Sequence, residues 1–142
     1  MSTKLGGIIV GESVHTVFVY GTLLVGEANH HVAKPNLLNV ETGSVRGFLY
    51  NVGSYPALVL NEHGMEVVGE WFTVTTEGLA KMDLLEGFSE GRSDNLYERI
   101  IVQDSDKSKK GYVYVFDKQK TEFLPLIKTG SWRRRSNIPR TS

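Results

Sequence analysis

The sequence predicts an α+β domain, a small β-barrel of about five to seven strands with one or two flanking helices. Segments rich in Val, Ile, Tyr and Phe recur along the chain, whereas only one segment has a clear helical pattern. Glycines are spread among the strands and turns, as is usual where a small sheet bends. A doubly wound α/β fold does not fit, because it would need several more helices.

The expected strands are separated by turn-forming residues, and several of them alternate apolar with polar side chains. Such alternation is typical of a sheet that packs one face against the core. The predicted strands cover residues 14–20, 44–52, 66–75, 97–103 and 111–116.

The one well-marked helix is predicted over residues 77–86. Thr75 or Thr76 provides an N-cap, and Glu77 lies near the positive end of the helix dipole. Gly87 stands where a helix commonly ends in a glycine. A weaker helical turn is expected after Asn29, so the domain has one or two helices.

The length of 142 residues, 40% of them hydrophobic, is enough for one core but hardly for two. One domain is therefore expected over residues 14–132, with flexible ends at 1–13 and 133–142. The glycine-rich stretch 6–11 is interpreted as a flexible lead-in, because no strand is expected before it and no phosphate-binding lysine follows. The apolar run at 8–10 is too short for a signal peptide or a membrane span.

Charge and composition limit the classes of partner that we expect for this protein. Lysine plus arginine equal aspartate plus glutamate at 16 each, so no overall field favours nucleic acid or an anionic membrane. The basic cluster at 133–135 is interpreted as a solvated end. The absence of cysteine removes disulfides and a cysteine nucleophile, which fits the cytoplasm. The four histidines lack metal-ligand spacing, so no metal or cofactor is expected. A monomer and a homodimer both fit the sequence.

The apolar run at 17–19 ends abruptly in Tyr20, Gly21, Thr22 and Leu23. A strand that stops in this way leaves a phenol, a hydroxyl and free backbone N–H groups at the rim of a sheet, where they can bind an anion. Gly21 would permit a positive φ and a close approach to a ligand. The alternative is an ordinary strand end with a glycine turn.

Glu86 belongs to the apolar stripe of the predicted helix, because it returns to within about 20° of Leu79 and 40° of Met82 around the axis. Burial, the negative end of the helix dipole and the like charge of Asp83 would all raise its pKa. A carboxyl that is partly neutral near pH 7 suits proton transfer. Alternatively, Glu86 turns out to solvent or pairs with Arg92 or Arg99.

Several ordered motifs resemble those of the γ-glutamylcyclotransferase family, which includes γ-glutamylamine cyclotransferases. The matching pieces are 18–23 (Phe-Val-Tyr-Gly-Thr-Leu), Gly26 with Asn29 and His30, 55–58 (Tyr-Pro-Ala-Leu), 68–70 (Val-Gly-Glu), 83–87 (Asp-Leu-Leu-Glu-Gly), 96–99 (Leu-Tyr-Glu-Arg) and 130–132 (Gly-Ser-Trp). No single piece is specific, but their shared order spans most of the chain.

The resemblance implies a small γ-glutamylcyclotransferase-like β-barrel that converts a γ-glutamyl small molecule into 5-oxoproline and an amine or peptide. Glu86 would be the catalytic acid/base, and the residues from Tyr20 to Leu23 would bind the glutamyl part. Tyr97 and Trp132 are candidate pocket walls, although aromatic residues in a barrel also serve as core. Arg99 is either a carboxylate partner or a surface residue, and is not expected to be catalytic.

Two departures from the family pattern put the substrate in doubt. Residues 88–96 form a longer, polar loop after Glu86, which is expected to shape the leaving-group side of the pocket. Ser131 replaces the usual aspartate of the C-terminal motif. The competing hypotheses are a non-catalytic ligand-binding or interaction domain on the same barrel and, less favoured, a nucleic-acid-binding barrel with a basic tail.

Overall fold

A computed structural model describes residues 3–5, 8–10 and 13–136 of the chain. Its main sheet has six strands in the order β5-β4-β6-β3-β8-β7. The strands are β3 (Val14–Val19), β4 (Leu37–Asn51), β5 (Pro56–Leu60), β6 (Met65–Thr75), β7 (Glu98–Gln103) and β8 (Lys110–Val115). The helices are α1 (His30–Ala33) and α2 (Thr76–Leu85), with 3-10 turns η1 (Lys34–Asn36), η2 (Lys118–Thr121) and η3 (Trp132–Arg134).

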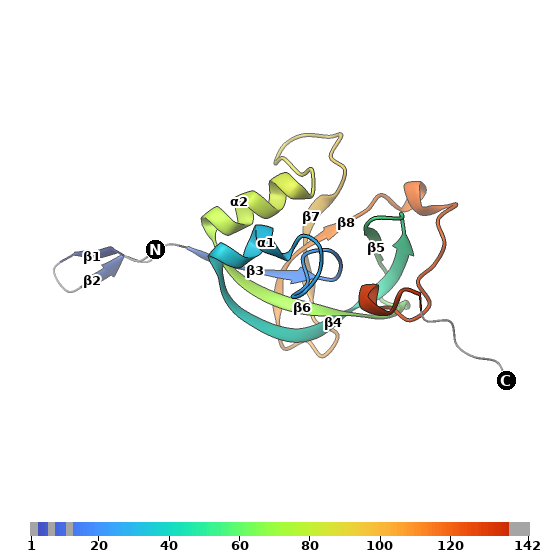
Figure 1. The fold of residues 1–142 in the computed structure, drawn as a ribbon, viewed down its shortest axis with the longest axis horizontal. Helices are drawn as coiled ribbons and strands as arrows, with labels where there is room; N and C mark the ends of the chain where they lie inside the picture. The colour runs from blue at the N-terminus through green and yellow to red at the C-terminus, as the bar shows by residue number, and fades with distance from the viewer. Residues whose placement is uncertain (1–2, 6–7, 11–12, 137–142) are drawn as a thin grey trace.

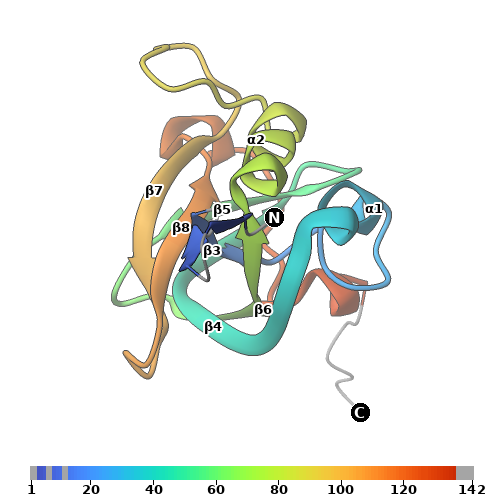
Figure 2. The same ribbon diagram turned by 90° about the vertical axis from the view of Figure 1, so that its left-hand side faces the viewer.

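The sheet is strongly curled, and α2 lies across one of its sides with α1 next to it (Figures 1 and 2). All pairings are antiparallel except that of β3 with β8. The long strand β4 pairs first with β6 and then with β5, so it bridges two parts of the curl. Phe116 N, just beyond β8, donates to Leu58 O of β5 at 2.9 Å, which brings an outer strand back toward the middle of the sheet. The predicted α+β class and barrel-like sheet are confirmed.

The core fills the inside of this curl with side chains from every central strand. Phe18, Trp71 and Phe72 are its largest fully buried members, and Met82 of α2 is also fully buried. The rings of Phe18 and Trp71 meet edge to face, with centroids 5.2 Å apart. The helix is therefore held to the sheet by its apolar stripe, as the sequence pattern predicts.

Helix α2 begins and ends where its sequence predicts, within one residue. The Thr75 side chain accepts a hydrogen bond from Gly78 N at 3.1 Å, which caps the first turn. Gly87 has φ +66°, and Phe88 N donates to Asp83 O at 2.9 Å. Glu86 is thus the last residue before the chain leaves the helix. In the described part of the chain, neither helix is long and apolar enough to cross a membrane.

Two strand predictions need correction. β5 was not expected, since it has only five residues and opens with Pro56; a proline fits the first position of an edge strand, where it costs no ladder bond. β4 begins seven residues earlier than the predicted strand at Ser44, because pairing with β6 stabilises a stretch of mostly exposed side chains.

The ends of the chain also differ from the expected flexible segments. Thr3–Leu5 (β1) and Ile8–Val10 (β2) pair antiparallel, so strands stand where a lead-in without strands is predicted. Two glycines separate these runs in the sequence, a spacing that favours hairpins. At the other end, Arg133 and Arg134 belong to η3, and Arg133 forms a hydrogen bond with Glu70 of the domain. Residues 137–142 lie outside the described residues.

Candidate active site

The end of β3, the start of β5 and the end of α2 enclose a cavity of about 30 Å³. Tyr20, Gly21, Thr22 and Leu23 form one wall, and Glu86 and Tyr97 lie among the other lining residues. The structure therefore brings together six of the seven residues that the sequence singles out. The volume is room for about two water molecules.

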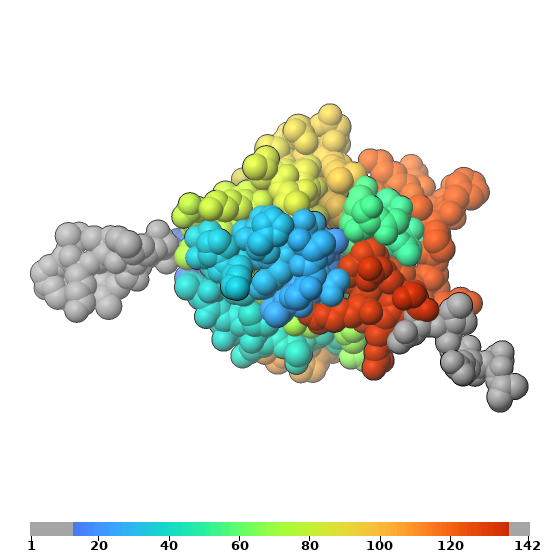
Figure 3. Space-filling view, in the orientation of Figure 1, coloured from blue at the N-terminus to red at the C-terminus, as the bar shows by residue number. Residues whose placement is uncertain are grey.

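The cavity adjoins a second hollow of about 130 Å³, which we call the outer groove. The two share Thr22, Tyr55, Glu86 and Tyr97 as lining residues. Asn29, Leu85 and Leu96 complete the outer groove. In the space-filling view, the segment after β3, helix α2 and the segment around β5 meet on one face, and the loop after α2 rises above them (Figure 3). Glu86 thus stands between an inner and an outer compartment.

The loop after β3 lines the inner cavity and carries backbone donors. Its carbonyl groups are taken, because Leu24 N donates to Gly21 O at 3.1 Å and Asn29 N to Thr22 O at 2.8 Å. The Asn29 side chain also donates to Thr22 Oγ1 at 3.0 Å. Within the described residues, the N–H groups of Gly21, Thr22 and Leu23 donate to no protein acceptor. These groups can therefore receive an anionic ligand.

The reason for a glycine at position 21 differs from the one expected. Gly21 does not have a positive φ. Instead, a Cβ atom at this position would lie 2.5 Å from Pro56 Cγ, far inside van der Waals contact. The glycine lets the loop pack directly against the first residue of β5, which closes the cavity on that side.

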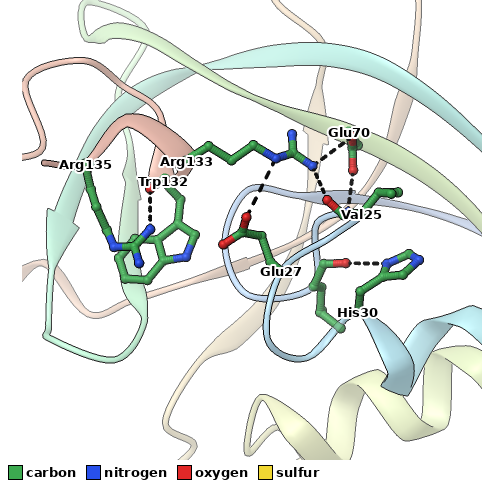
Figure 4. A network of polar contacts seen from close by, with 8 residues as sticks. Val25, Glu27, His30, Glu70, Trp132, Arg133 and Arg135 are labelled. Carbon is green, nitrogen blue, oxygen red and sulfur yellow. Dashed lines mark hydrogen bonds and ion pairs between the residues drawn. The ribbon is translucent and has the colours of Figure 1, made fainter. Parts of the chain in front are cut away.

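A polar network behind this loop was not foreseen from the sequence (Figure 4). Glu70 of β6 accepts from Val25 N at 3.0 Å and from the Arg133 guanidinium at 3.3 Å. Arg133 also donates to Val25 O at 2.6 Å, and its Nε lies 3.9 Å from a Glu27 oxygen. Arg133 is therefore not part of a solvated tail: it links the C-terminal segment to the loop that carries the backbone donors.

Glu86 has the environment that its place in the apolar stripe predicts. Burial raises the pKa of its carboxyl from 4.5 to about 7. Within the described residues, no hydrogen bond or ion pair joins this carboxylate to another side chain. Arg92 pairs instead with Asp94 at 3.1 Å, and Arg99 with Asp83 at 2.5 Å, so neither alternative partner is available.

The expected contribution of Asp83 to that pKa is wrong, because the charge of Asp83 is compensated. Its carboxylate binds the Arg99 guanidinium and also accepts from Tyr114 Oη at 2.6 Å. The Arg99 guanidinium carbon lies 4.8 Å from the ring centre of Phe88 and 4.4 Å from that of Tyr112. Arg99 is thus mostly buried rather than on the surface, and these contacts hold the last turn of α2 against β7 and β8.

Two of the four tyrosines that line the cavity, Tyr20 and Tyr97, use their hydroxyl groups for structure. Tyr20 Oη donates to Tyr114 O at 2.5 Å, and Tyr97 Oη donates to Pro56 O. Burial raises the pKa of each phenol well above its usual value, so both stay protonated at neutral pH. They contribute ring surface to the cavity, while their hydroxyl protons are already committed to backbone carbonyls.

Trp132 is the predicted pocket residue that the structure does not bring to the cavity. Its indole is buried in the core cluster, and the Arg135 guanidinium carbon lies 3.9 Å from its ring centre (Figure 4). Neither the inner cavity nor the outer groove includes it. An aromatic residue near the C-terminus can fill core space as readily as a pocket, and only packing decides between the two.

A buried carboxylate with several hydrogen-bond donors lies at the other end of β7. Asp104 is 7% exposed and follows the last residue of that strand. Its Oδ1 accepts from Ser44 N at 3.0 Å and from Trp71 Nε1 at 2.7 Å, and its Oδ2 accepts from Asp106 N at 3.1 Å. Both oxygens of Asp104 therefore have partners. Among the described residues, no group of three or more His, Asp or Glu side chains could hold a metal ion.

Fold and cavity together define a single-domain α+β protein with a candidate small-molecule site where strands meet a helix end. Residues 17–134 match the family model described as gamma-glutamyl cyclotransferase, AIG2-like. The chain belongs to this γ-glutamyl cyclotransferase family, and the resemblance of its motifs is thereby confirmed.

Two relatives illustrate the match. The chain is 39% identical over 106 residues to a γ-L-glutamyl-butirosin B γ-glutamyl cyclotransferase of Niallia circulans, covering 72% of this chain and 67% of the relative. It is 35% identical over 124 residues to a putative γ-glutamylcyclotransferase of Vibrio cholerae, covering 85% and 97%. The names of these relatives indicate a γ-glutamylcyclotransferase-type enzyme.

Solved structures share the fold. An AIG2-like protein from Mus musculus superimposes with a TM-score of 0.60 at 24% identity, covering 80% of this chain and 85% of that one. A uropathogenic E. coli-specific protein superimposes with a TM-score of 0.68 at 16% identity, covering 87% and 96%. At these identities the likeness concerns the fold alone.

Proposed function

We propose that the protein is a γ-glutamyl cyclotransferase that releases 5-oxoproline and an amine from a γ-glutamyl substrate. One observation carries the proposal: the Glu86 carboxyl lines the same cavity as the loop after β3, and neither this carboxyl nor the N–H groups of that loop have a hydrogen-bond partner within the described residues. Family membership and the activity named for the Niallia relative support the same reaction.

The substrate would place its glutamyl α-carboxylate, or the oxyanion that develops on its γ-carbonyl, against the N–H groups of Gly21, Thr22 and Leu23. Donors that are fixed in a turn need little reorganisation when charge develops. The inner cavity would enclose the reacting carbonyl, and the outer groove would supply the remaining volume. No cation is needed among the residues that bind the carboxylate, because backbone dipoles provide the positive field.

The chemistry is an internal acyl transfer that requires no enzyme nucleophile. The ionised Glu86 removes a proton from the substrate's α-ammonium group, and the freed amine attacks the γ-carbonyl carbon. The same carboxyl then returns that proton to the departing nitrogen as the original amide bond breaks. The attacking nitrogen loses a second proton as the lactam forms, and this proton leaves with the released amine as its ammonium. With a pKa of about 7, Glu86 is an effective base and, once protonated, an effective acid near neutral pH.

Glu86→Gln tests this proposal, since it keeps the size and polarity of the side chain but cannot exchange the proton. We expect 5-oxoproline release from a panel of γ-glutamyl amines and peptides to fall by about 10²–10⁴-fold. Glu77→Gln is the matched control on the exposed side of the same helix, where Glu77 pairs only with Lys81. Circular dichroism and thermal unfolding check that both variants fold.

Undiminished turnover in Glu86→Gln would overturn the mechanism. Saturable binding of γ-glutamyl compounds by the wild type without any 5-oxoproline would instead favour a non-catalytic binding domain. The absence of cysteine fits a reducing compartment, and we propose that the enzyme works in the cytoplasm.

A further inference from the structure

The loop that carries the backbone donors is attached at both of its ends to one residue, Glu70 of β6. Val19, the last residue of β3, is the register partner of Glu70 in the sheet. The chain then leaves the sheet and returns to the same glutamate, where Val25 N donates to Glu70 Oε1 at 3.0 Å. Residues 20–24 are therefore enclosed between two contacts with Glu70.

Arg133 completes this attachment from the C-terminal segment. Its guanidinium donates to Val25 O at 2.6 Å and to Glu70 Oε2 at 3.3 Å (Figure 4). One ion pair thus binds both polar groups of the Val25 backbone, because Glu70 accepts from the N–H and Arg133 donates to the C=O. We call these three residues the Val25 clamp.

The two members of the ion pair depend on each other. The Glu70 side chain is 11% exposed, so its charge relies on protein donors more than on water. Within the described residues, those donors are Val25 N and the Arg133 guanidinium. Without Arg133 the carboxylate would keep one donor, and we expect it to turn toward water and release Val25.

The internal hydrogen bonds of the loop have a different effect from the clamp. Leu24 N donates to Gly21 O at 3.1 Å, and Asn29 N donates to Thr22 O at 2.8 Å. These bonds join parts of the loop to one another and determine its shape. The clamp attaches the far end of that shape to β6, the strand next to β3 in the sheet.

We infer that Arg133 is a positioning residue for the proposed reaction: through Val25 and Glu70 it holds the N–H groups of residues 21–23 against the substrate. This inference rests on the proposed function and adds a residue of the C-terminal segment that does not line the inner cavity. Donors stabilise developing charge best when their direction is fixed beforehand. A misplacement of about 1 Å can lower a rate by about 10²-fold.

Arg133→Gln tests the inference, because the side chain is 40% exposed and its loss disturbs little core packing. We expect kcat/KM for 5-oxoproline release, measured with the best substrate of the γ-glutamyl panel, to fall by about 10–100-fold. The midpoint of its pH profile should not move, since Glu86 is not a member of the clamp. Arg134→Gln is the matched control, because Arg134 is exposed and its side chain forms no ion pair within the described residues; it should keep the wild-type rate.

A double variant tests whether the clamp acts as a unit. Glu70→Gln keeps an acceptor for Val25 N but loses the charge that Arg133 binds. If both side chains act through Val25, the double variant Glu70→Gln/Arg133→Gln should lose no more kcat/KM than the more affected single variant. Losses that multiply would show that the two residues act independently and would overturn the inference.

Hydrogen exchange separates the loss of positioning from a general loss of stability. The amides of Val25 and Glu27 donate to Glu70 Oε1 and Leu24 O at 3.0 and 2.9 Å, so they report whether the end of the loop stays closed. In Arg133→Gln these two amides should exchange at least about 10-fold faster, while those of the β3–β6 ladder keep their rates. General destabilisation would accelerate both sets and would overturn the inference.

The possible failures are distinguishable. If the wild type releases no 5-oxoproline from any compound of the panel, the proposed function is wrong and the catalytic role of Arg133 is wrong with it; the exchange rates still decide whether Arg133 holds the loop. If the wild type is active and Arg133→Gln matches Arg134→Gln in kcat/KM, the function stands and the inference is wrong.

Discussion

Two carboxylates near opposite ends of β7 show how differently one fold can treat an acid: Asp104 is buried, whereas Glu86 is half-buried. Asp104, beyond the end of the strand, receives hydrogen bonds from two backbone N–H groups and from the Trp71 indole. Glu86, near the start of the strand, lines a cavity and has no partner among the described residues. Asp104 thus exchanges water for hydrogen-bond donors, whereas Glu86 loses only part of its contact with water and gains no such donor among the described residues.

This difference distinguishes Asp104, whose carboxylate joins parts of the fold, from Glu86, whose carboxyl is not engaged by donors among the described residues. Donors bind both oxygens of Asp104 and connect the β7–β8 turn to β4 and β6. Without such donors, burial acts alone on Glu86 and raises its pKa to about 7. Partial burial without donors disfavours the charged form of Glu86, and such a cost is expected where a group serves a reaction.

The largest expected effect is a pH dependence of the free energy of unfolding, which results from the raised pKa of Glu86. Glu86 has a pKa of about 7 in the folded protein and 4.5 as its ordinary value, so the folded state holds an additional proton between these pH values. The free energy of unfolding therefore falls as pH rises from about 4.5 to 7, by on the order of 3 kcal/mol from this group. Above pH 7 the contribution is constant.

Urea unfolding of the wild type and of Glu86→Gln at several pH values measures this dependence. The variant lacks the titrating group, so the difference between the two free energies should change across that window and level off on both sides. A difference that is independent of pH would show that Glu86 is solvated and would remove the contrast with Asp104.

Asp104→Asn should give the next largest effect, a loss of about 2 kcal/mol in the free energy of unfolding. The amide can still accept from Ser44 or Trp71, but its NH₂ group would face Asp106 N, a donor against a donor. Cyclisation activity should be retained, since Asp104 lies far along β7 from the cavity. Chemical denaturation and the 5-oxoproline assay measure the two quantities.

Asp94→Asn is the control for that substitution. Asp94 forms an exposed pair with Arg92, and its loss should change the free energy of unfolding by less than about 0.5 kcal/mol. If the two variants were equally stable, the hydrogen bonds of Asp104 would contribute little, and its burial would need another explanation.

The smallest effect is expected at Asp83, which lies one helical turn before Glu86. Like Asp104 it has hydrogen-bond donors, which are Arg99 and Tyr114. Tyr114→Phe removes one donor to this carboxylate and leaves the arginine. We expect a loss of about 1.5 kcal/mol in the free energy of unfolding, measured by denaturant titration. Tyr112→Phe, which keeps the ring beside Arg99, is the matched control and should change stability less.

Much of the fold could be predicted from local patterns. The capping residue Thr75, the apolar stripe through Leu79 and Met82, and the terminal glycine determine α2 within one residue. β5 was missed because a five-residue run beginning with proline has no alternation to mark it. The first part of β4 was not predicted, because its side chains are mostly exposed and show no alternation. Its strand structure depends on pairing with β6.

The candidate site was predictable in its members but not in its chemistry. Periodicity placed Glu86 among apolar neighbours, and the strand end at Tyr20 indicated backbone donors. Glu70 lies in one of the motifs that resemble the family, but its interaction with Arg133, which supports the loop from behind, carries no local signal, because it joins residues 63 positions apart. Trp132 is the opposite case: it belongs to a motif that resembles the family, but it does not line the cavity.

The sequence by itself determined the main helix and most of the strands, placed Glu86 in the apolar stripe of that helix and showed the resemblance to the family. These features depend on residues close together along the chain, where periodicity and capping act. Only the tertiary structure decided which charges are compensated. Arg99 meets Asp83 rather than Glu86, and the phenols of Tyr20 and Tyr97 meet backbone carbonyls. Partners of this kind are set by the curl of the sheet, which brings distant residues together and leaves Glu86 without one.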